Sequence, residues 1–158
     1  QLGLQVERQF CDLVQKQAAA ALRLAVDGRG VFVLAATSNP EGPQVQQART
    51  ADGRSVAQVM VDEAAARNAG ADTLGSVGVV VGATLTRAPD LSALHGPILM
   101  PGVGAQGGTA EDVRRLAGDR LDAVVPNVSR EVLRAGPTPA ALRDAVSRTV
   151  DAFAFLRA

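Results

Sequence analysis

The stretch LMPGVGAQGGT, Leu99–Thr109, runs from apolar residues through a glycine-dense turn into the start of a helix. Glycine reaches positive φ and has no Cβ, so the backbone here can pass close to an anion, toward which the amides of a helix start point. Thr109 and Asp112 have the spacing of a capping box, which indicates a helix start. The stretch therefore predicts a strand, a phosphate-binding loop and a helix, with an ordinary glycine-rich turn as the alternative.

The same strand-then-helix pattern recurs along the chain. Four apolar runs without polar alternation are typical of strands buried on both faces: 31–36, 77–81, 97–100 and 122–126. Helical spacing and capping residues predict helices or helical turns between and after them: 55–69, 89–94, 109–117, a short one ending at 135, and one from Thr138 to the C-terminus. This alternation predicts a parallel sheet with right-handed crossovers, as in a small doubly wound fold or half of an eight-stranded barrel.

The first residues have a different pattern. Apolar residues within Leu4–Val26 fall near helical spacing and predict one amphipathic helix that ends at Asp27-Gly28. We therefore divide the chain into an amphipathic N-terminal helix of unclear origin, residues 1–27, and four βα units over residues 28–158.

Composition excludes several classes of function. The 158 residues have a formal net charge of 0, which argues against a nucleic-acid partner. The single cysteine, Cys11, excludes an internal disulfide and suits a reducing compartment, and the single histidine, His95, excludes a multi-histidine metal site. The sequence has neither a signal-peptide pattern nor an apolar run of about 20 residues, so we expect a cytoplasmic protein with no membrane partner.

Four motifs occur in a fixed order: Val33–Gly42 (VLAATSNPEG), Val79–Thr84 (VVVGAT), Pro101–Gly108 (PGVGAQGG) and Ser129–Glu131 (SRE). Together they resemble the second half of the orotidine 5′-phosphate decarboxylases, in the bacterial subgroup with a TSNPEG loop. The resemblance covers roughly Leu22–Ala158. It implies a (β/α)₈ TIM barrel with these strands as its fifth to eighth, and a homodimer. It also implies decarboxylation of orotidine 5′-monophosphate to uridine 5′-monophosphate (UMP) without a cofactor.

The resemblance also implies site residues. Thr37 and Ser38 contact the pyrimidine, and Arg130 grips two phosphate oxygens. The phosphate loop contains four glycines and a glutamine that bridges base and phosphate: Gly102, Gly104, Gln106, Gly107 and Gly108. Independently, barrels often bind phosphate in the loops after their last two strands. The structural alternatives are a capping or turn role for Thr37 and Ser38, and a surface salt bridge for Arg130.

One family motif does not occur in this sequence. Members carry an Asp-x-Lys-x-x-Asp pattern, whose lysine protonates the carbon that loses carbon dioxide. Here Lys16 is the single lysine, and Asp12 precedes it by four positions, which fits a surface pair on a helix. We identify no catalytic residue in this chain, and we expect it to be inactive or nearly so alone, because a positioned proton donor contributes roughly 10²–10⁴-fold.

Half a barrel would also leave two apolar strand edges unpaired, which proteins cover or pair. The N-terminal helix could shield one edge, two copies could close a ring, a second chain could supply the missing strands, or the sequence could be part of a longer molecule. We expect a nucleoside monophosphate ligand and either a homo-oligomer or a completing chain. The alternatives are a non-catalytic half-barrel fragment or engineered module, and a small doubly wound domain that binds phosphorylated sugars.

Overall fold

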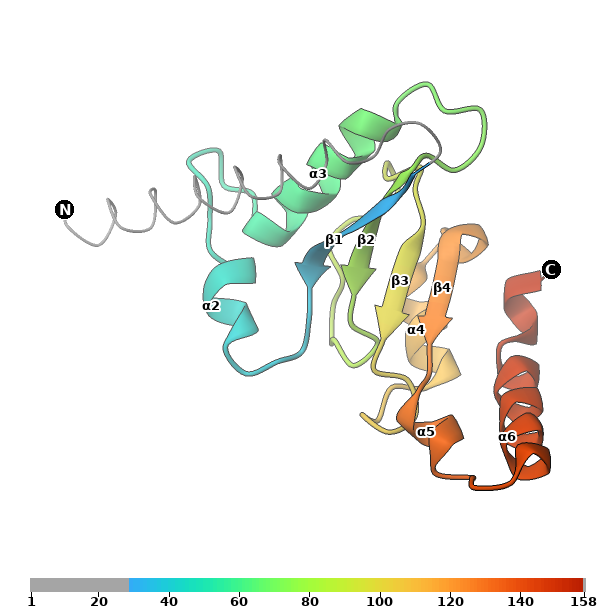
Figure 1. Ribbon diagram of the computed structural model, residues 1–158. Helices are drawn as coiled ribbons and strands as arrows, with labels where there is room; N and C mark the ends of the chain where they lie inside the picture. Colours follow the sequence, from blue (N-terminus) through green and yellow to red (C-terminus); the bar gives the residue numbers. More distant parts are fainter. Residues whose placement is uncertain (1–28, 158) are drawn as a thin grey trace.

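The computed structural model describes residues 29–157 (Figure 1). The helix predicted over 4–26, with Cys11 and Lys16, lies outside the described residues. The strands form one parallel sheet in the order β1-β2-β3-β4, which confirms the predicted architecture. Their bounds are β1 (Val31–Ala36), β2 (Val77–Val81), β3 (Ile98–Pro101) and β4 (Val124–Asn127). The helices are α2 (Gly42–Gln46), α3 (Val56–Asn68), α4 (Ala110–Ala117), α5 (Arg130–Leu133) and α6 (Pro139–Ala152), with 3-10 turns η1 (Leu121–Ala123) and η2 (Ala154–Arg157).

Side-chain caps fix the starts of the three longer helices. The Ser55 hydroxyl accepts from the Gln58 amide at 3.1 Å at the start of α3, and Thr138 caps α6 in the same way. At α4, Thr109 and Asp112 form the predicted capping box. These starts are confirmed because capping depends on residues within one turn of each other.

Three local predictions differ from the structure. The turn predicted over 89–94 is shorter: the Leu94 amide donates to the Leu91 carbonyl in a single turn, and before it the Asp90 carboxylate accepts from the Ser92 amide, as in an Asx-turn. The last helix ends at Ala152 and is followed by η2. The short helix α2 interrupts the polar loop after β1, because Pro43 in its first turn has the φ that a helix start requires.

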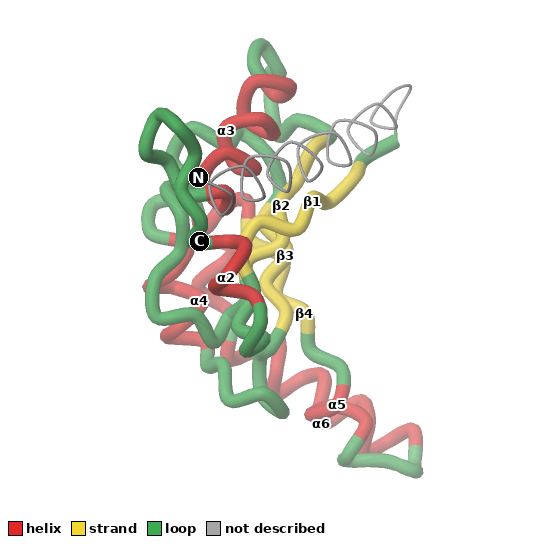
Figure 2. Tube along the Cα trace, turned by 90° about the vertical axis from the view of Figure 1, so that its left-hand side faces the viewer, coloured by secondary structure: helices red, strands yellow, loops and turns green. Residues whose placement is uncertain are grey.

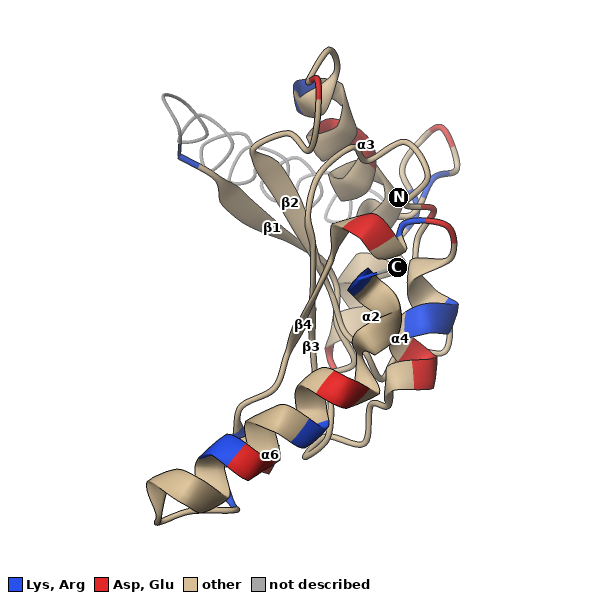
Figure 3. Ribbon diagram, turned by 90° about the vertical axis from the view of Figure 1, so that its right-hand side faces the viewer, with Lys and Arg blue, Asp and Glu red and all other residues tan. Residues whose placement is uncertain are grey.

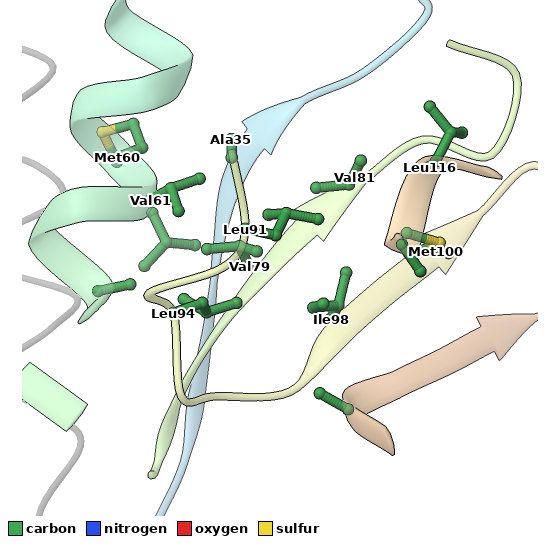
Figure 4. Packing of buried hydrophobic residues seen from close by; sticks show 14 of the residues in the cluster. Ala35, Met60, Val61, Val79, Val81, Leu91, Leu94, Ile98, Met100 and Leu116 are labelled. Atoms are coloured by element: carbon green, nitrogen blue, oxygen red, sulfur yellow. The ribbon is translucent and has the colours of Figure 1, made fainter. Parts of the chain in front are cut away.

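Helices cover only one face of the sheet in the described part of the chain (Figure 2). The core lies on this covered face, where side chains of the strands meet α3 and α4; Figure 4 shows Val61 of α3 pointing toward Ala35 and Val79 of the sheet. The strand residues that point into this core are almost fully buried: Val33, Ala35, Val77, Val79, Val81, Ile98 and Met100. The expectation of strands buried on both faces is therefore met on one face only.

The opposite face, which we call the open face, is apolar and largely uncovered. Leu34, Val80, Leu99 and Val125 are neighbours in register across the four strands. Leu34 is 56% exposed and Val125 45%. The four strands carry no charged residue (Figure 3). A row of this kind matches the inward-facing side chains of a barrel.

On the open face, a large side chain of β1 packs over a glycine of β2. Phe32 pairs in register with Gly78, and a Cβ added to Gly78 would lie 2.6 Å from the Phe32 ring and 2.6 Å from the Pro97 carbonyl oxygen. The phenylalanine therefore occupies the space that the missing side chain leaves.

Asn68, at the end of α3, is the single buried polar residue of the described core, at 2% exposed. Its amide nitrogen donates to the carbonyls of Val77 at 2.8 Å and Leu94 at 2.9 Å, and its oxygen accepts from the Val77 amide at 3.1 Å. One side chain thereby fixes the start of β2 and the turn before β3 to α3. No helix within residues 29–157 has the length and apolarity needed to cross a membrane.

Candidate functional site

The candidate site lies at the carboxyl ends of the strands, since parallel strands all end at the same edge of the sheet (Figure 1). Four loops leave this edge: 37–41, 82–84, 102–108 and 128–129. They contain every predicted site residue except Arg130, which follows the last loop at the start of α5.

Thr37 and Ser38 differ in their hydrogen bonding. The Thr37 hydroxyl donates to the Asn39 side chain and accepts from the Gln46 amide nitrogen at 2.9 Å, while the Thr37 amide donates to the Gln46 oxygen at 3.0 Å. The Ser38 hydroxyl accepts from Thr84 at 2.6 Å and donates to no described residue. Thr37 therefore has the bonding of a turn residue, whereas the Ser38 hydroxyl proton is available to a ligand.

The glycines shape the loop after β3. Gly102, Gly104 and Gly107 have φ of 101°, 71° and 93°, in the region that favours glycine. Gly108 is required for a different reason: a Cβ there would lie 2.8 Å from the Gly102 carbonyl oxygen and 2.9 Å from the Ala83 side chain. The predicted backbone geometry is therefore present.

Most of the glycine amides are not directed outward, however. The amides of Gly104, Gly107 and Gly108 donate to carbonyls within the loop at 2.8, 2.7 and 3.1 Å. At the tip of the loop, the amides of Ala105 and Gln106 have no acceptor among residues 29–157. In this structure the glycines close the loop on itself, and these two tip amides are free to meet an anion.

The Gln106 side chain folds back across the loop. Its oxygen lies 3.5 Å from the position that a Cβ on Gly102 would occupy, and the Thr84 methyl lies 3.8 Å from the same position. Gln106 and the loop after β2 therefore both approach Gly102.

The start of α4 is partly occupied by its own cap. The Thr109 amide donates to the Asp112 carboxylate at 3.1 Å, and the Thr109 hydroxyl donates to it at 2.7 Å. The Thr109 hydroxyl, then Arg115, and then the Thr109 amide hold the pKa of Asp112 below its ordinary value of 3.8. Since this carboxylate already sits at the helix start, α4 contributes less positive potential than an uncapped helix would.

Arg130 lies close to the glycine loop but does not line its cavity. Its neighbour Glu131 contacts the loop, since a Cβ on Gly104 would lie 2.8 Å from the Glu131 Cβ. A cavity of about 260 Å³ lies between the loop and α6, and it is lined by Gly104, Gly108 and Arg148 among others. Arg130 is exposed and forms no salt bridge with a described residue, so the structure gives no support to its surface-pair alternative. Arg148 was not predicted, because on α6 it follows the pattern of any solvent-facing arginine.

A second, larger hollow of about 860 Å³ lies beside the loop after β1 and is lined by Thr37, Ser38, Gln46 and Thr84 among others. Of the predicted site residues, Thr37 and Ser38 line this hollow and Gly104 and Gly108 line the smaller cavity. The others line neither: Gly102, Gln106, Gly107 and Arg130. Thr84 is bonded to Ser38 and lies next to Gly102. Within residues 29–157, no group of three or more His, Cys, Asp or Glu side chains could hold a metal ion.

Comparison with known proteins gives one consistent result. The family model described as "Orotidine 5'-phosphate decarboxylase / HUMPS family" matches residues 10–145. The chain is 60% identical over 127 residues to an orotidine 5′-phosphate decarboxylase of Salinispora arenicola, covering 80% of this chain and 46% of that protein. A relative of the same name from Corynebacterium glutamicum (strain R) is 54% identical over 129 residues, with the same coverage.

Solved structures agree with these matches. A crystal structure from Streptomyces avermitilis, provisionally named an orotidine 5′-phosphate decarboxylase, superposes with a TM-score of 0.73 at 50% identity, covering 80% of this chain and 45% of that one. The orotidine monophosphate decarboxylase of Leishmania donovani gives a TM-score of 0.54 at 29% identity. The chain spans about half the length of the curated relatives it matches.

Proposed function

Because the chain belongs to the orotidine 5′-phosphate decarboxylase / HUMPS family, we propose that it binds a pyrimidine nucleoside 5′-monophosphate and serves the decarboxylation of orotidine 5′-monophosphate to UMP. The family confirms the resemblance carried by the four motifs, and its match begins at residue 10, upstream of Leu22. The observation that carries the proposal is that a Ser38 hydroxyl with its proton free and a loop with three glycines at positive φ lie at the same edge of the sheet.

In this proposal each group meets the part of the ligand that its chemistry suits. The Ser38 hydroxyl donates to the base, and Thr37 holds the turn that presents Ser38. The Arg130 guanidinium pairs with phosphate oxygens, because charge-assisted bidentate contacts are among the strongest hydrogen bonds. Gln106 lies between the two ends of the ligand, and the glycines give the loop the shape in which its tip amides face the phosphate.

The proton donor must come from elsewhere in this proposal. The 158 residues contain no Asp-x-Lys-x-x-Asp motif. These 158 residues would therefore bind product without forming it, and residues outside them would supply the lysine and the aspartates.

We further propose that, when these 158 residues are alone, a second copy of them covers the open face. Both β1 and β4 have one edge that pairs with no other described strand. A twofold rotation about an axis along the strands would place β4 of each copy beside β1 of the other, in parallel, and the two open faces would then fill a ring of eight strands. We favour a second copy because this arrangement pairs both free edges, those of β1 and β4, with strands of the same chain type. If a separate chain supplies the missing strands instead, the proposal of a second copy is wrong.

Titration calorimetry with UMP, together with an assay of carbon dioxide release from orotidine 5′-monophosphate, tests the proposed function. We expect binding of UMP without turnover. Arg130→Ala should weaken binding about tenfold or more, because a hydrogen bond to a charged group contributes about 1.5–3 kcal/mol.

The matched control is Arg143→Ala, since Arg143 is equally exposed but lies within α6, whereas Arg130 directly precedes the residue that contacts Gly104. Turnover by the chain alone would refute the claim that these residues lack the proton donor. Absence of UMP binding, or equal losses in the two variants, would refute the nucleotide site. Binding without turnover also keeps a purely binding module as the second candidate, which the missing motif favours.

A further inference from the structure

Thr84 follows β2 and has no role among the site residues assigned above. Its hydroxyl donates to the Ser38 oxygen at 2.6 Å, across 46 positions of sequence. Since this bond occupies one lone pair of Ser38 and leaves its proton free, Ser38 can donate that proton to a ligand while Thr84 holds its oxygen.

The other face of Thr84 adjoins the glycine loop. Its methyl lies 3.8 Å from the position that a Cβ on Gly102 would occupy. The preceding residue fixes this approach, because the Ala83 amide donates to the Pro101 carbonyl at 2.8 Å and the fully buried Ala83 side chain packs against Gly108. The loop at residues 82–84 is therefore held to the strand that leads into the phosphate loop.

We propose that Thr84 is a positioning residue that holds the Ser38 hydroxyl in its donating orientation and at a set distance from the phosphate loop. This inference rests on the proposed function. Thr84 itself does not touch the ligand in this account: it acts on the base through Ser38. The part of the ligand beyond the ribose should therefore depend on Thr84, and the phosphate end should not.

Two ligands separate these ends: UMP, which carries the base, and ribose 5-phosphate, which lacks it. We expect Thr84→Val, which keeps the methyl position and removes the donor, to weaken UMP binding about fivefold, as the loss of one neutral hydrogen bond does. Binding of ribose 5-phosphate should not change. Thr84→Ser, which restores the hydroxyl, should recover most of the UMP affinity.

A double-mutant cycle tests the route through Ser38. In a Ser38→Ala background, Thr84→Val should have no further effect on UMP binding, because the bond that it removes is already absent. The matched control is Thr73→Val, at an exposed threonine that bonds to no described residue and lines neither hollow. It should leave both ligands unaffected.

The results that overturn the inference differ from those that overturn the function. If the unsubstituted chain binds both ligands and Thr84→Val binds them equally well, or loses both equally, Thr84 does not position Ser38. Additive losses in the cycle would also rule out positioning through Ser38. If the unsubstituted chain binds ribose 5-phosphate but not UMP, the base site fails and the inference with it. If it binds neither ligand, the proposed function itself is wrong.

Discussion

The two faces of the sheet are built from the same strands and the same kinds of residue, yet their surroundings are opposite. On the covered face Val79, Ile98 and Met100 are 0% exposed. On the open face Leu34 is 56% exposed, although it lies in register with Val80 and has a buried residue on either side of it in sequence. The strands therefore have the composition of strands that are buried on both faces of a sheet, whereas the described fold buries only one face.

The largest effect should come from truncation on the covered face. Ile98→Ala leaves a cavity in a closed core and should cost about 3 kcal/mol of unfolding free energy. Leu34→Ala on the open face should cost less than about 1 kcal/mol when the chain is dilute, since surface substitutions have small effects. Urea unfolding of both variants measures the difference. Equal losses in dilute solution would mean that the open face is covered within one chain.

Asn68 allows the same comparison of a buried with an exposed position for a polar side chain. Asn68→Ala removes three hydrogen bonds from a buried site, and we expect a loss of about 2–3 kcal/mol. Asn127→Ala, at an exposed position on β4, is the matched control and should change stability little. A small loss for Asn68→Ala would indicate that water replaces its bonds.

A charged substitution on the open face tests whether a second copy covers that face. If two copies face each other, Leu34→Glu should weaken self-association about tenfold or more, because it buries a charge in an apolar interface. Leu133→Glu, at a 67% exposed leucine outside the sheet, is the control. Native mass and light scattering over a concentration series measure the change. A monomeric unsubstituted chain would refute the second copy, and dimerisation only after mixing with the other half of a relative would assign the face to a separate chain.

The smallest effect concerns the cap of α4, which packs Val113 and Leu116 onto the covered face. The pKa of Asp112 is lower in the fold than its ordinary value of 3.8. Its contribution to stability is therefore complete above that value and is lost as the pH falls through the lowered pKa. Asp112→Asn should flatten the acid side of the stability profile. An identical profile in the variant would show that the carboxylate does not stabilise α4.

The sequence was informative where a structure depends on neighbours along the chain. Thr109 with Asp112, Ser55 and Thr138 each form their cap within one turn, and the strands follow from uninterrupted apolar runs. Contacts between distant segments were not predictable. A turn role was the alternative for both Thr37 and Ser38, and the Thr37 hydroxyl takes it. Nothing in the pattern indicated that Ser38 would instead be bonded by Thr84, because that pair joins loops 46 positions apart.

The site shows the same limit. Positive φ at Gly102, Gly104 and Gly107 followed from composition, since glycine adopts it at low cost. Which amides are left free depends on how the loop folds back, and the structure leaves those of Ala105 and Gln106. Burial on both faces could not be tested from sequence, because it depends on strands that the 158 residues do not provide.

The contact between Phe32 and Gly78 limits how the inner layer can vary among relatives. A side chain at position 78 would meet a phenylalanine ring on one side, which a smaller residue at position 32 would relieve. On the other side it would meet the Pro97 carbonyl, which is main chain and is present whatever residue stands there. We therefore expect the residue at position 32 to vary among relatives while position 78 stays glycine. A smaller residue at 32 should not be accompanied by a larger one at 78, as happens between ordinary core neighbours.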